Sequence, residues 1–431
     1  MNRRTFIKTS ALATGGVVAA QSAVAETGWL TGDDVIRIGL IGCGGRGTGA
    51  AAQALSTKQN VRLVAMGDAF RDRLDDSLKN LRKEGQYDDR IEVTEETKFV
   101  GFEAYRSVIE LCDVVLIATP PGFRPIHFEA AIDAGKHVFM EKPVATDAPG
   151  VRKILAAAAK AKAQKLNVVV GLQRRYQKKY TEWVERLHNG AIGEIISTRV
   201  YWNSGGVWTR PRQEGQTEME YQMRNWYYFN WLCGDHIVEQ HIHNLDVGNW
   251  VKQAYPVSAM GMGGRQVRTG KEHGEIFDHH SVEYEYADGS RMFSQCRHMK
   301  GCQNRVTESF HGSNGNAPKP GLIETGSGYQ LWKYRDRNDP SPYQVEHDEL
   351  FATIANGEFK HADAENGAYA TLTAIMGRMA TYSGQIIHWD DALNSELSLM
   401  PRTFAFDADP PILPDESGFY PIPTPGVTRV L

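Results

Sequence analysis

The feature that most constrains the fold is a glycine-rich turn between an apolar run and an Ala-rich segment. Residues 35–41 read as a short strand, and the turn that follows has the spacing G-x-G-x-x-G, formed by Gly42, Gly44 and Gly47. Gly42 permits a tight turn, Gly44 lets the backbone approach a pyrophosphate, and Gly47 lets a helix pack on the strand. The pattern therefore predicts a dinucleotide-binding site.

Two neighbouring features refine the predicted cofactor. The helix that begins near Gly45 and Arg46 would offer free N–H groups to the phosphates. A second apolar run ends at Asp68, where a carboxylate can accept hydrogen bonds from the adenine-ribose hydroxyls and repel a 2′-phosphate. We therefore expect NAD rather than NADP, although Arg71 and Arg73 leave room for the phosphate.

The order of expected elements predicts two domains. Apolar strands within residues 112–121 and 136–143 alternate with helical patterns, as in a doubly wound parallel sheet. Residues 193–203 and 279–298 instead read as strands without intervening helices, with an Ala-Asp-Gly-Ser hairpin turn. The predicted fold class is α/β: an N-terminal Rossmann domain followed by a C-terminal α+β domain with a large, open, mostly antiparallel sheet.

The predicted boundaries divide the chain into four parts. Residues 35–165 form the Rossmann domain, 166–400 the substrate and oligomerisation domain, and 401–431 a proline-rich tail extended over the surface. Residues 1–25 contain a twin arginine, a weakly apolar run and a final Ala-Val-Ala, which together predict a twin-arginine signal peptide. Since that pathway exports folded proteins, we expect a periplasmic protein with a tightly bound cofactor.

Composition excludes several classes of partner. The formal net charge of −4 and the lack of a long basic run argue against nucleic acid. After the N-terminus there is no run of eighteen apolar residues, so the mature chain should not span a membrane. The five cysteines fit no zinc spacing; Cys296 and Cys302 could pair, or could equally be free thiols.

The segment "ATPPGFRPIHFEAAIDAGKHVFMEKPVA", residues 118–145, resembles the Gfo/Idh/MocA family of glucose-fructose oxidoreductases and inositol dehydrogenases. The resemblance covers most of the chain and implies an NAD(P)-dependent, homo-oligomeric oxidoreductase. It assigns Lys142 as the catalytic lysine and Pro143 to a turn that is often cis. The residues it places around the cofactor are Thr119, Pro120, His127, Glu141 and Lys142.

A second segment, "DHIVEQHIHNLD" (residues 235–246), is rich in histidines and carboxylates. With Asp235 as N-cap, a helix is expected from His236 to about residue 251. His236, Glu239 and His243 could converge on zinc, but Gln240 stands where the second histidine of the usual zinc motif would lie. We therefore predict no metal here and interpret the segment as an acid/base pair.

The family pattern on this helix identifies His243 as the catalytic histidine. Glu239 occupies the position of an aspartate in the family, and would orient and charge-stabilise His243. We expect His243, titrating near neutrality, to take the hydroxyl proton of the substrate while Lys142 stabilises the developing oxyanion.

The predicted substrate is a carbohydrate. Candidate contacts are Tyr176, Arg174, Trp202 and His236, and the aromatic residues 226–231 could be either core or a face for sugar rings. The predicted reaction is hydride transfer from a sugar or glycoside hydroxyl to the bound nicotinamide. Two alternatives are an NAD-dependent glycosidase like those of family 109, which oxidise, eliminate and reduce in turn, and a non-catalytic dinucleotide-binding sensor.

Overall fold

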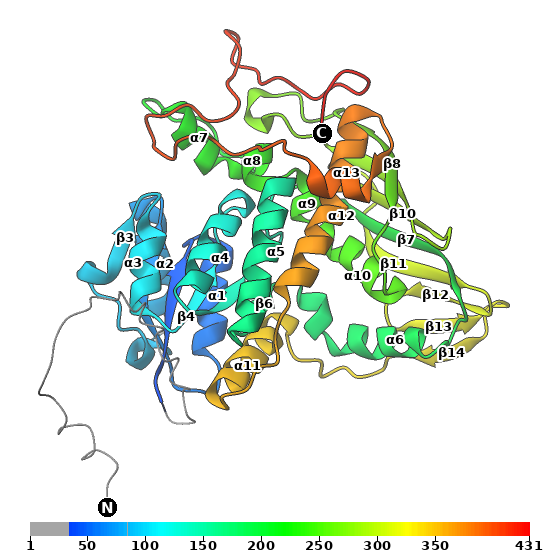
Figure 1. The fold of residues 1–431 in the computed structure, drawn as a ribbon, viewed down its shortest axis with the longest axis horizontal. Coiled ribbons are helices and arrows are strands. Elements are labelled where there is room, and N and C mark those ends of the chain that lie inside the picture. The colour runs from blue at the N-terminus through cyan, green and yellow to red at the C-terminus, as the bar shows by residue number, and fades with distance from the viewer. Residues whose placement is uncertain (1–33, 84) are drawn as a thin grey trace, which may run out of the picture.

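The structure, a computed structural model, describes residues 34–83 and 85–431, so the predicted signal peptide at residues 1–25 lies outside the described residues. Its N-terminal domain contains a parallel sheet of six strands in the order β3-β2-β1-β4-β5-β6 (Figure 1). This is the Rossmann order, and it confirms the predicted fold of the first half. The strands are β1 (Ile36–Ile41), β2 (Val61–Asp68), β3 (Lys98–Val100), β4 (Val114–Ile117), β5 (His137–Met140) and β6 (Val168–Val170).

Helices bury both faces of this sheet, as its apolar strands require. In β4, Val114 belongs to one hydrophobic core and Val115 to another, because successive side chains of a strand point to opposite faces. The helices of this part of the chain are α1 (Gly45–Leu55), α2 (Arg71–Arg82), α3 (Ala104–Leu111), α4 (Arg124–Asp133) and α5 (Ala148–Ala163).

The second domain contains a nine-stranded sheet in the order β14-β13-β12-β11-β7-β10-β9-β8-β15. All its strand pairs are antiparallel except β7 with β10, which confirms the predicted open and mostly antiparallel sheet. The strands are β7 (Ile195–Ser204), β8 (Ser258–Gly264), β9 (His279–Glu285), β10 (Arg291–His298), β11 (Arg305–Gly312), β12 (Gly315–Lys319), β13 (Leu322–Thr325), β14 (Gln330–Lys333) and β15 (Ile387–His388).

The long helix α12 (Ala364–Ser383) joins the two domains, because it packs on α5 on one side and on β8 and β9 on the other (Figure 1). Almost all of its side chains are therefore buried. The remaining helices are α6 (Lys178–His188), α7 (Glu218–Arg224), α8 (Asn230–Cys233), α9 (His236–Glu239), α10 (Ile242–Lys252), α11 (Pro342–Ala355) and α13 (Trp389–Asn394).

The chain crosses between the domains more often than the sequence suggested. Strand β6 pairs with β5, so the first sheet continues past the boundary predicted at residue 165. Helix α11 returns from the second domain and packs on α1, where Leu350 and Phe351 complete a core of the first domain. Residues far apart in sequence therefore build one domain.

The C-terminal tail, residues 401–431, has no helix or strand and runs along the upper edge of the molecule in Figure 1. Its rings nevertheless pack: Phe406 lies 5.3 Å from Phe70 and 4.8 Å from Phe102, between ring centroids. Across the described part of the chain, we find no helix with the length and apolar character needed to cross a bilayer.

Candidate active site

A cavity of about 720 Å³ opens between the two domains, at the carboxyl ends of the parallel strands. This is where open α/β sheets bind ligands, since the turns that leave these strands meet there. The predicted residues that line it are Gly42, Gly44, Gly45, Arg46, Asp68, Thr119, Pro120, His127, Glu141, Lys142, Trp202, Glu239 and His243. Residues from sequence positions 42 to 243 thus meet in one space.

The glycine-rich turn has the geometry that a dinucleotide requires. Gly42 has φ +94°, and a Cβ there would lie 2.5 Å from the Thr119 nitrogen, so no other residue fits. A Cβ at Gly47 would overlap the Gly42 carbonyl, which is why helix and strand can pack closely. A Cβ at Gly44 or Gly45 would meet nothing within 4 Å, so this backbone faces open space at the start of α1. These residues fit a pyrophosphate.

Asp68 lies at the end of β2 and lines the cavity. Its carboxylate accepts hydrogen bonds from the backbone N–H groups of Cys43, at 2.7 Å, and Phe70, at 2.9 Å, which fix its orientation. Burial raises its pKa, and these two hydrogen bonds oppose that rise. Of the two nearby arginines, Arg73 lines the cavity, whereas Arg71 is paired with Asp75 and Glu95. Arg71 is therefore not available to a ribose phosphate.

Lys142 follows β5 and reaches across the cavity to the second domain. Its ammonium donates to the carbonyl oxygen of Glu239 at 2.7 Å and to the Oε1 atom of Glu239 at 3.1 Å. The peptide bond between Lys142 and Pro143 is cis. Because both side chains are largely buried, the pair fixes the lysine beside the α9–α10 segment.

His243 lies on α10 with its ring stacked on Trp202, at a centroid distance of 6.0 Å. Its pKa is lowered well below the ordinary value by burial first, and then by the positive charges of Lys142 and Arg174. The prediction that His243 titrates near neutrality is therefore wrong, because it did not account for this burial. A neutral imidazole at physiological pH is the form that can accept a proton.

Glu141 is held by Arg46, whose Nε atom lies 2.5 Å from Glu141 Oε1. The Arg46 guanidinium also lies 3.4 Å from Glu346 and 5.1 Å from the ring of Tyr343, both on α11. The pKa of Glu346 is raised well above its usual range, by burial and then by the negative charge of Glu141. The first turn of α1 is thereby connected to the turn that carries Lys142.

His127 and Thr119 form the wall of the cavity after β4. Thr119 Oγ1 lies 3.2 Å from His127 Nδ1, and the His127 ring stacks on Phe123 at 5.9 Å. Burial first, and then the charge of Arg124, lower the pKa of His127 to about 3. His127 is therefore a neutral part of the wall at physiological pH.

The helix predicted from His236 to residue 251 is interrupted. Helix α9 ends at Glu239, and α10 begins at Ile242 after a break at Gln240 and His241. Asp235 caps α9 as predicted, with its carboxylate accepting from the His236 N–H. The break is stabilised by side chains from the second sheet: Gln240 contacts His298 and His241 contacts Ser294.

Three of the predicted substrate contacts lie outside the cavity. The Tyr176 hydroxyl donates at 2.6 Å to Asp363, the residue that precedes α12. Arg174 forms a buried ion pair with Glu308, and its guanidinium lies 6.0 Å from the centroid of the Trp202 ring. His236 is fully buried against Asp235. None of these three residues lines the cavity, because Tyr176 and Arg174 pair with residues distant in sequence and the rings of His280 and His298 pack on His236.

His236, Glu239 and His243 do not meet in one place, because His236 is buried outside the cavity that the other two residues line. A different set, Asp235, His236 and His280, brings ligand atoms within 4.8 Å. However, the Asp235 carboxylate already accepts from the backbone N–H of residue 277, the hydroxyl of residue 382 and His236, and it lies 3.3 Å from His280 Nε2. A cationic guanidinium, that of Arg268, also lies 3.4 Å from His236 Nδ1, so this set has no place for a metal ion.

The aromatic segment 226–231 divides between the two expected roles. Tyr227, Tyr228, Phe229 and Trp231 are core residues. Trp226 lines the cavity together with Trp208, and their rings meet edge to face at 5.9 Å. Trp202 also lines the cavity.

Several lining residues were missed in the sequence analysis. Arg124 is buried there, and burial lowers its pKa to about 10. Tyr343 comes from α11 and Arg210 from the loop after β7, far from any motif. Gln240 could have been predicted from the sequence, because it lies between Glu239 and His243.

The five cysteines are unpaired in the structure, and Cys302 is exposed while the other four are buried. Cys296 and Cys302, whose pairing the sequence left open, are thus separate thiols here.

Comparison with known proteins agrees with this geometry. Residues 36–171 match the GFO_IDH_MocA family, described as an oxidoreductase family with an NAD-binding Rossmann fold. An inositol 2-dehydrogenase of Serratia proteamaculans is 27% identical over 368 residues, which cover 82% of this chain and 96% of that protein. An inositol 2-dehydrogenase of Cereibacter sphaeroides is 28% identical over 350 residues, covering 79% and 92%.

Solved structures show the same fold at low sequence identity. The crystal structure of an aldose-aldose oxidoreductase from Caulobacter crescentus matches with a TM-score of 0.62 and 17% identity, covering 82% of this chain and 100% of that one. The fold and site thus define an NAD-binding oxidoreductase. More specifically, residues 36–171 match the Gfo/Idh/MocA oxidoreductase family, and most of the chain is similar to inositol 2-dehydrogenases.

Proposed function

We propose that this protein is an NAD-dependent dehydrogenase that oxidises a secondary hydroxyl of a sugar or cyclitol. The observation that supports this most strongly is the meeting of Lys142, Glu239 and His243 in the cavity that the glycine-rich turn also lines. The inositol 2-dehydrogenase relatives make a cyclitol or a related polyol the substrate class to test first.

In the proposed reaction, each of these residues has a separate role. Bound NAD supplies the hydride acceptor. His243, which is neutral, accepts the proton of the substrate hydroxyl, and Lys142 places a positive charge where the oxyanion develops. Glu239 fixes the Lys142 ammonium through its carbonyl and carboxylate oxygens. Trp202 fixes the plane of the His243 ring.

The aromatic lining supports a carbohydrate. Trp202, Trp208 and Trp226 all border the cavity, and flat rings suit the apolar C–H faces of sugar and cyclitol rings. The exposed Trp208 would extend this surface beyond a single ring.

A panel of myo-inositol, D-glucose and nitrophenyl glycosides tests the proposal. We expect at least one polyol to reduce NAD on the protein, seen as NADH absorbance. Release of nitrophenol without net NADH would instead indicate the oxidation, elimination and reduction sequence of a glycosidase. If no compound changes the nucleotide or is converted, the protein is a dinucleotide-binding sensor and the proposed function is wrong.

We also propose that the protein is exported with NAD already bound, through the twin-arginine signal at residues 1–25. Phe70 and Phe102, which line the nucleotide end of the cavity, are covered by Phe404 and Phe406 of the tail, which supports slow release of a bound nucleotide. Cell fractionation of the wild type and of an Arg3→Lys, Arg4→Lys variant tests export. Equal periplasmic amounts would contradict it.

Finally, we propose a homo-oligomer formed through the outer face of the second sheet. Met260 and Met262 on β8 and Phe293 on β10 are exposed on the same face of that sheet, with β9 between the two strands, and leave apolar surface in water. Sedimentation analysis should give an oligomer that a Met262→Glu, Phe293→Glu variant weakens. A monomeric wild type would contradict this proposal.

A further inference from the structure

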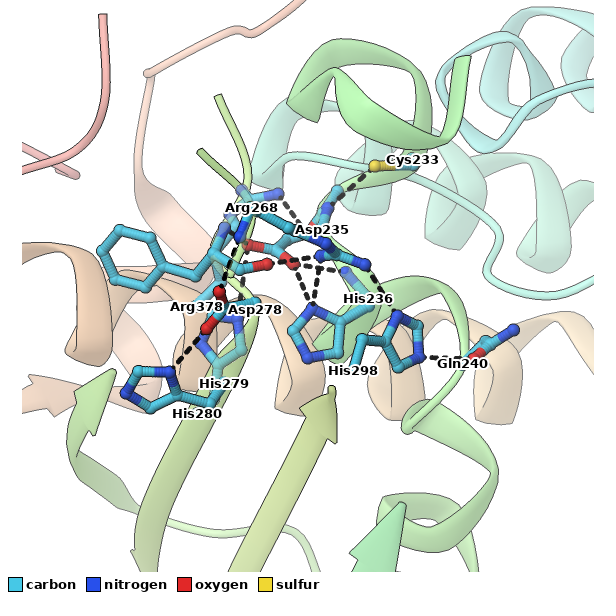
Figure 2. A network of polar contacts seen from close by, with 12 residues as sticks. Cys233, Asp235, His236, Gln240, Arg268, Asp278, His279, His280, His298 and Arg378 are labelled. Carbon is cyan, nitrogen blue, oxygen red and sulfur yellow. Dashed lines mark hydrogen bonds and ion pairs between the residues drawn. The ribbon is translucent and has the colours of Figure 1, made fainter. Parts of the chain in front are cut away.

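Gln240 lies at the border between the cavity and a buried polar network. Gln240 lines the cavity and lies in the break between the end of α9 at Glu239 and the start of α10 at Ile242. Its Oε1 atom lies 2.9 Å from Nε2 of His298, the last residue of β10. Figure 2 shows Gln240 at one end of a chain of contacts that continues through His298 to Arg268.

These contacts determine which ring nitrogen of His298 carries the proton and which way the Gln240 amide is turned. The Arg268 Nη2 atom lies 2.7 Å from His298 Nδ1, and a guanidinium can only donate. His298 Nδ1 must therefore be the accepting nitrogen, and the single N–H of the neutral ring lies on Nε2. That N–H faces Gln240, so the Gln240 atom beside it must be the amide oxygen, because an amide nitrogen would face the N–H with another donor.

Burial maintains this arrangement. His298 and Arg268 are each 3% exposed, and the His298 ring stacks on Tyr227 at 6.1 Å. Burial, together with the charges of His236 and Arg268, lowers the pKa of His298 well below its ordinary value, which keeps the ring neutral. Among the described residues, no protein atom accepts a hydrogen bond from the Gln240 amide nitrogen, and this nitrogen is not enclosed by the protein.

From this geometry we propose that Gln240 is a specificity-determining residue, whose amide N–H is held toward the cavity to donate to an oxygen of the substrate. His298 and Arg268 act as positioning residues, since neither of them lines the cavity and His298 reaches it through Gln240. The position requires an acceptor, such as a hydroxyl, ring or acyl oxygen, and rejects an ammonium group, which can only donate. The inference deepens the proposed function and rests on it: the substrate class is a neutral polyol or acylated sugar rather than a free amino sugar.

The test compares Gln240→Met, which keeps the length of the side chain and removes the donor, with Gln240→Glu, which offers only acceptors. Gln164→Met, at an exposed position at the end of α5, is the matched control. For the holoenzyme with myo-inositol or D-glucose, whichever it oxidises faster, we expect Gln240→Met to lower kcat/KM by about 10-fold to 100-fold, mainly through KM. Bound NAD and the unfolding temperature should not change.

Two further variants separate positioning from simple structure. His298→Leu leaves the amide free to turn and should raise KM less than Gln240→Met does. His298→Gln places an N–H near the original Nε2 and should restore much of the affinity. With Gln240→Glu, the preference of the enzyme for D-glucose over D-glucosamine should narrow, because an acceptor now faces the ammonium.

Titration calorimetry with the same polyols gives a readout that does not depend on turnover. Weaker polyol binding in Gln240→Met without any turnover in the wild type would support the inference and refute the proposed function. Turnover in the wild type with kcat/KM and affinity unchanged in Gln240→Met would overturn the inference alone. Loss of NAD or of folding in Gln240→Met would also overturn it, because Gln240 would then be a structural residue.

Discussion

The Lys142 ammonium lies 2.7 Å from the carbonyl oxygen and 3.1 Å from the Oε1 atom of Glu239, and this contact joins the two domains across the cavity. The lysine leaves the parallel sheet after β5, and the glutamate ends α9 in the second domain. The Lys142 ammonium is thus positioned by both domains at once.

This contact predicts that Lys142 and His243 act mainly in the transition state. Lys142→Met and His243→Ala should each lower turnover about 10²-fold to 10⁴-fold, as for a lost acid/base group. Bound NAD should remain, because the glycine-rich turn is unchanged. The turnover of the double variant should be little lower than that of the less active single variant, since both residues serve one proton transfer. Steady-state rates and nucleotide content are measured together, with Lys153→Met on the exposed side of α5 as the control.

Near-normal turnover in either single variant would remove the role assigned to that residue. Loss of NAD together with activity in Lys142→Met would make the lysine a binding residue instead.

The pKa of His243 provides a second prediction. Protonation of His243 removes the proton acceptor, so activity should fall as the pH drops through this pKa. Because burial, then Lys142 and Arg174, lower the pKa well below 6.5, activity should persist below pH 6.5. Lys142→Met removes a positive charge and should raise the pKa of His243, though not to its ordinary value, since the burial remains. NMR titration of labelled histidines measures this; an identical pKa in both proteins would show that Lys142 does not act on His243.

The position of Asp68 in the cavity predicts a preference for NAD over NADP. Its carboxylate is oriented by the N–H groups of Cys43 and Phe70 and should repel a 2′-phosphate. Asp68→Ser should weaken NAD binding about 10-fold and bring NADP affinity close to it, because Arg73 also lines this end of the cavity. Fluorescence titration of refolded apoprotein with both nucleotides is the measurement. Equal or tighter NADP binding by the wild type would contradict the role of Asp68.

Buried neutral histidines predict acid sensitivity of the fold. Burial lowers the pKa of His347 well below 6.5 and that of His127 to about 3. Below pH 6.5 the unfolded chain therefore takes up protons that the folded chain does not, and the free energy of unfolding falls as the pH drops. At pH 5, each such histidine lowers the free energy of unfolding by on the order of 2 kcal/mol.

His347→Leu should therefore make the unfolding midpoint in urea less dependent on pH between pH 6.5 and 5. His347 suits this test because both of its ring nitrogens are buried without a partner. Replacement of the exposed His188 should leave the pH dependence unchanged. The same slope in His347→Leu and the wild type would contradict the prediction.

The predictable and unpredictable parts of the site differ in the range of the interactions that build them. The glycine-rich turn, Asp68 at the end of its strand and the Lys142 turn are local patterns, so the sequence was sufficient to predict them. The break at Gln240 depends on His298 of β10, and Tyr176 is withdrawn from the cavity by Asp363. Such partners are set by sheet order and helix packing, which have no local signal.

The most direct test of the central claim follows the nucleotide on the purified full-length protein. Mass spectrometry identifies the bound nucleotide, and absorbance then follows it after addition of myo-inositol or D-glucose, for the wild type and for Lys142→Met. We expect bound NAD in both proteins and its conversion to NADH in the wild type alone. A bound nucleotide that no polyol or glycoside reduces, or equal reduction in the two proteins, would contradict the account.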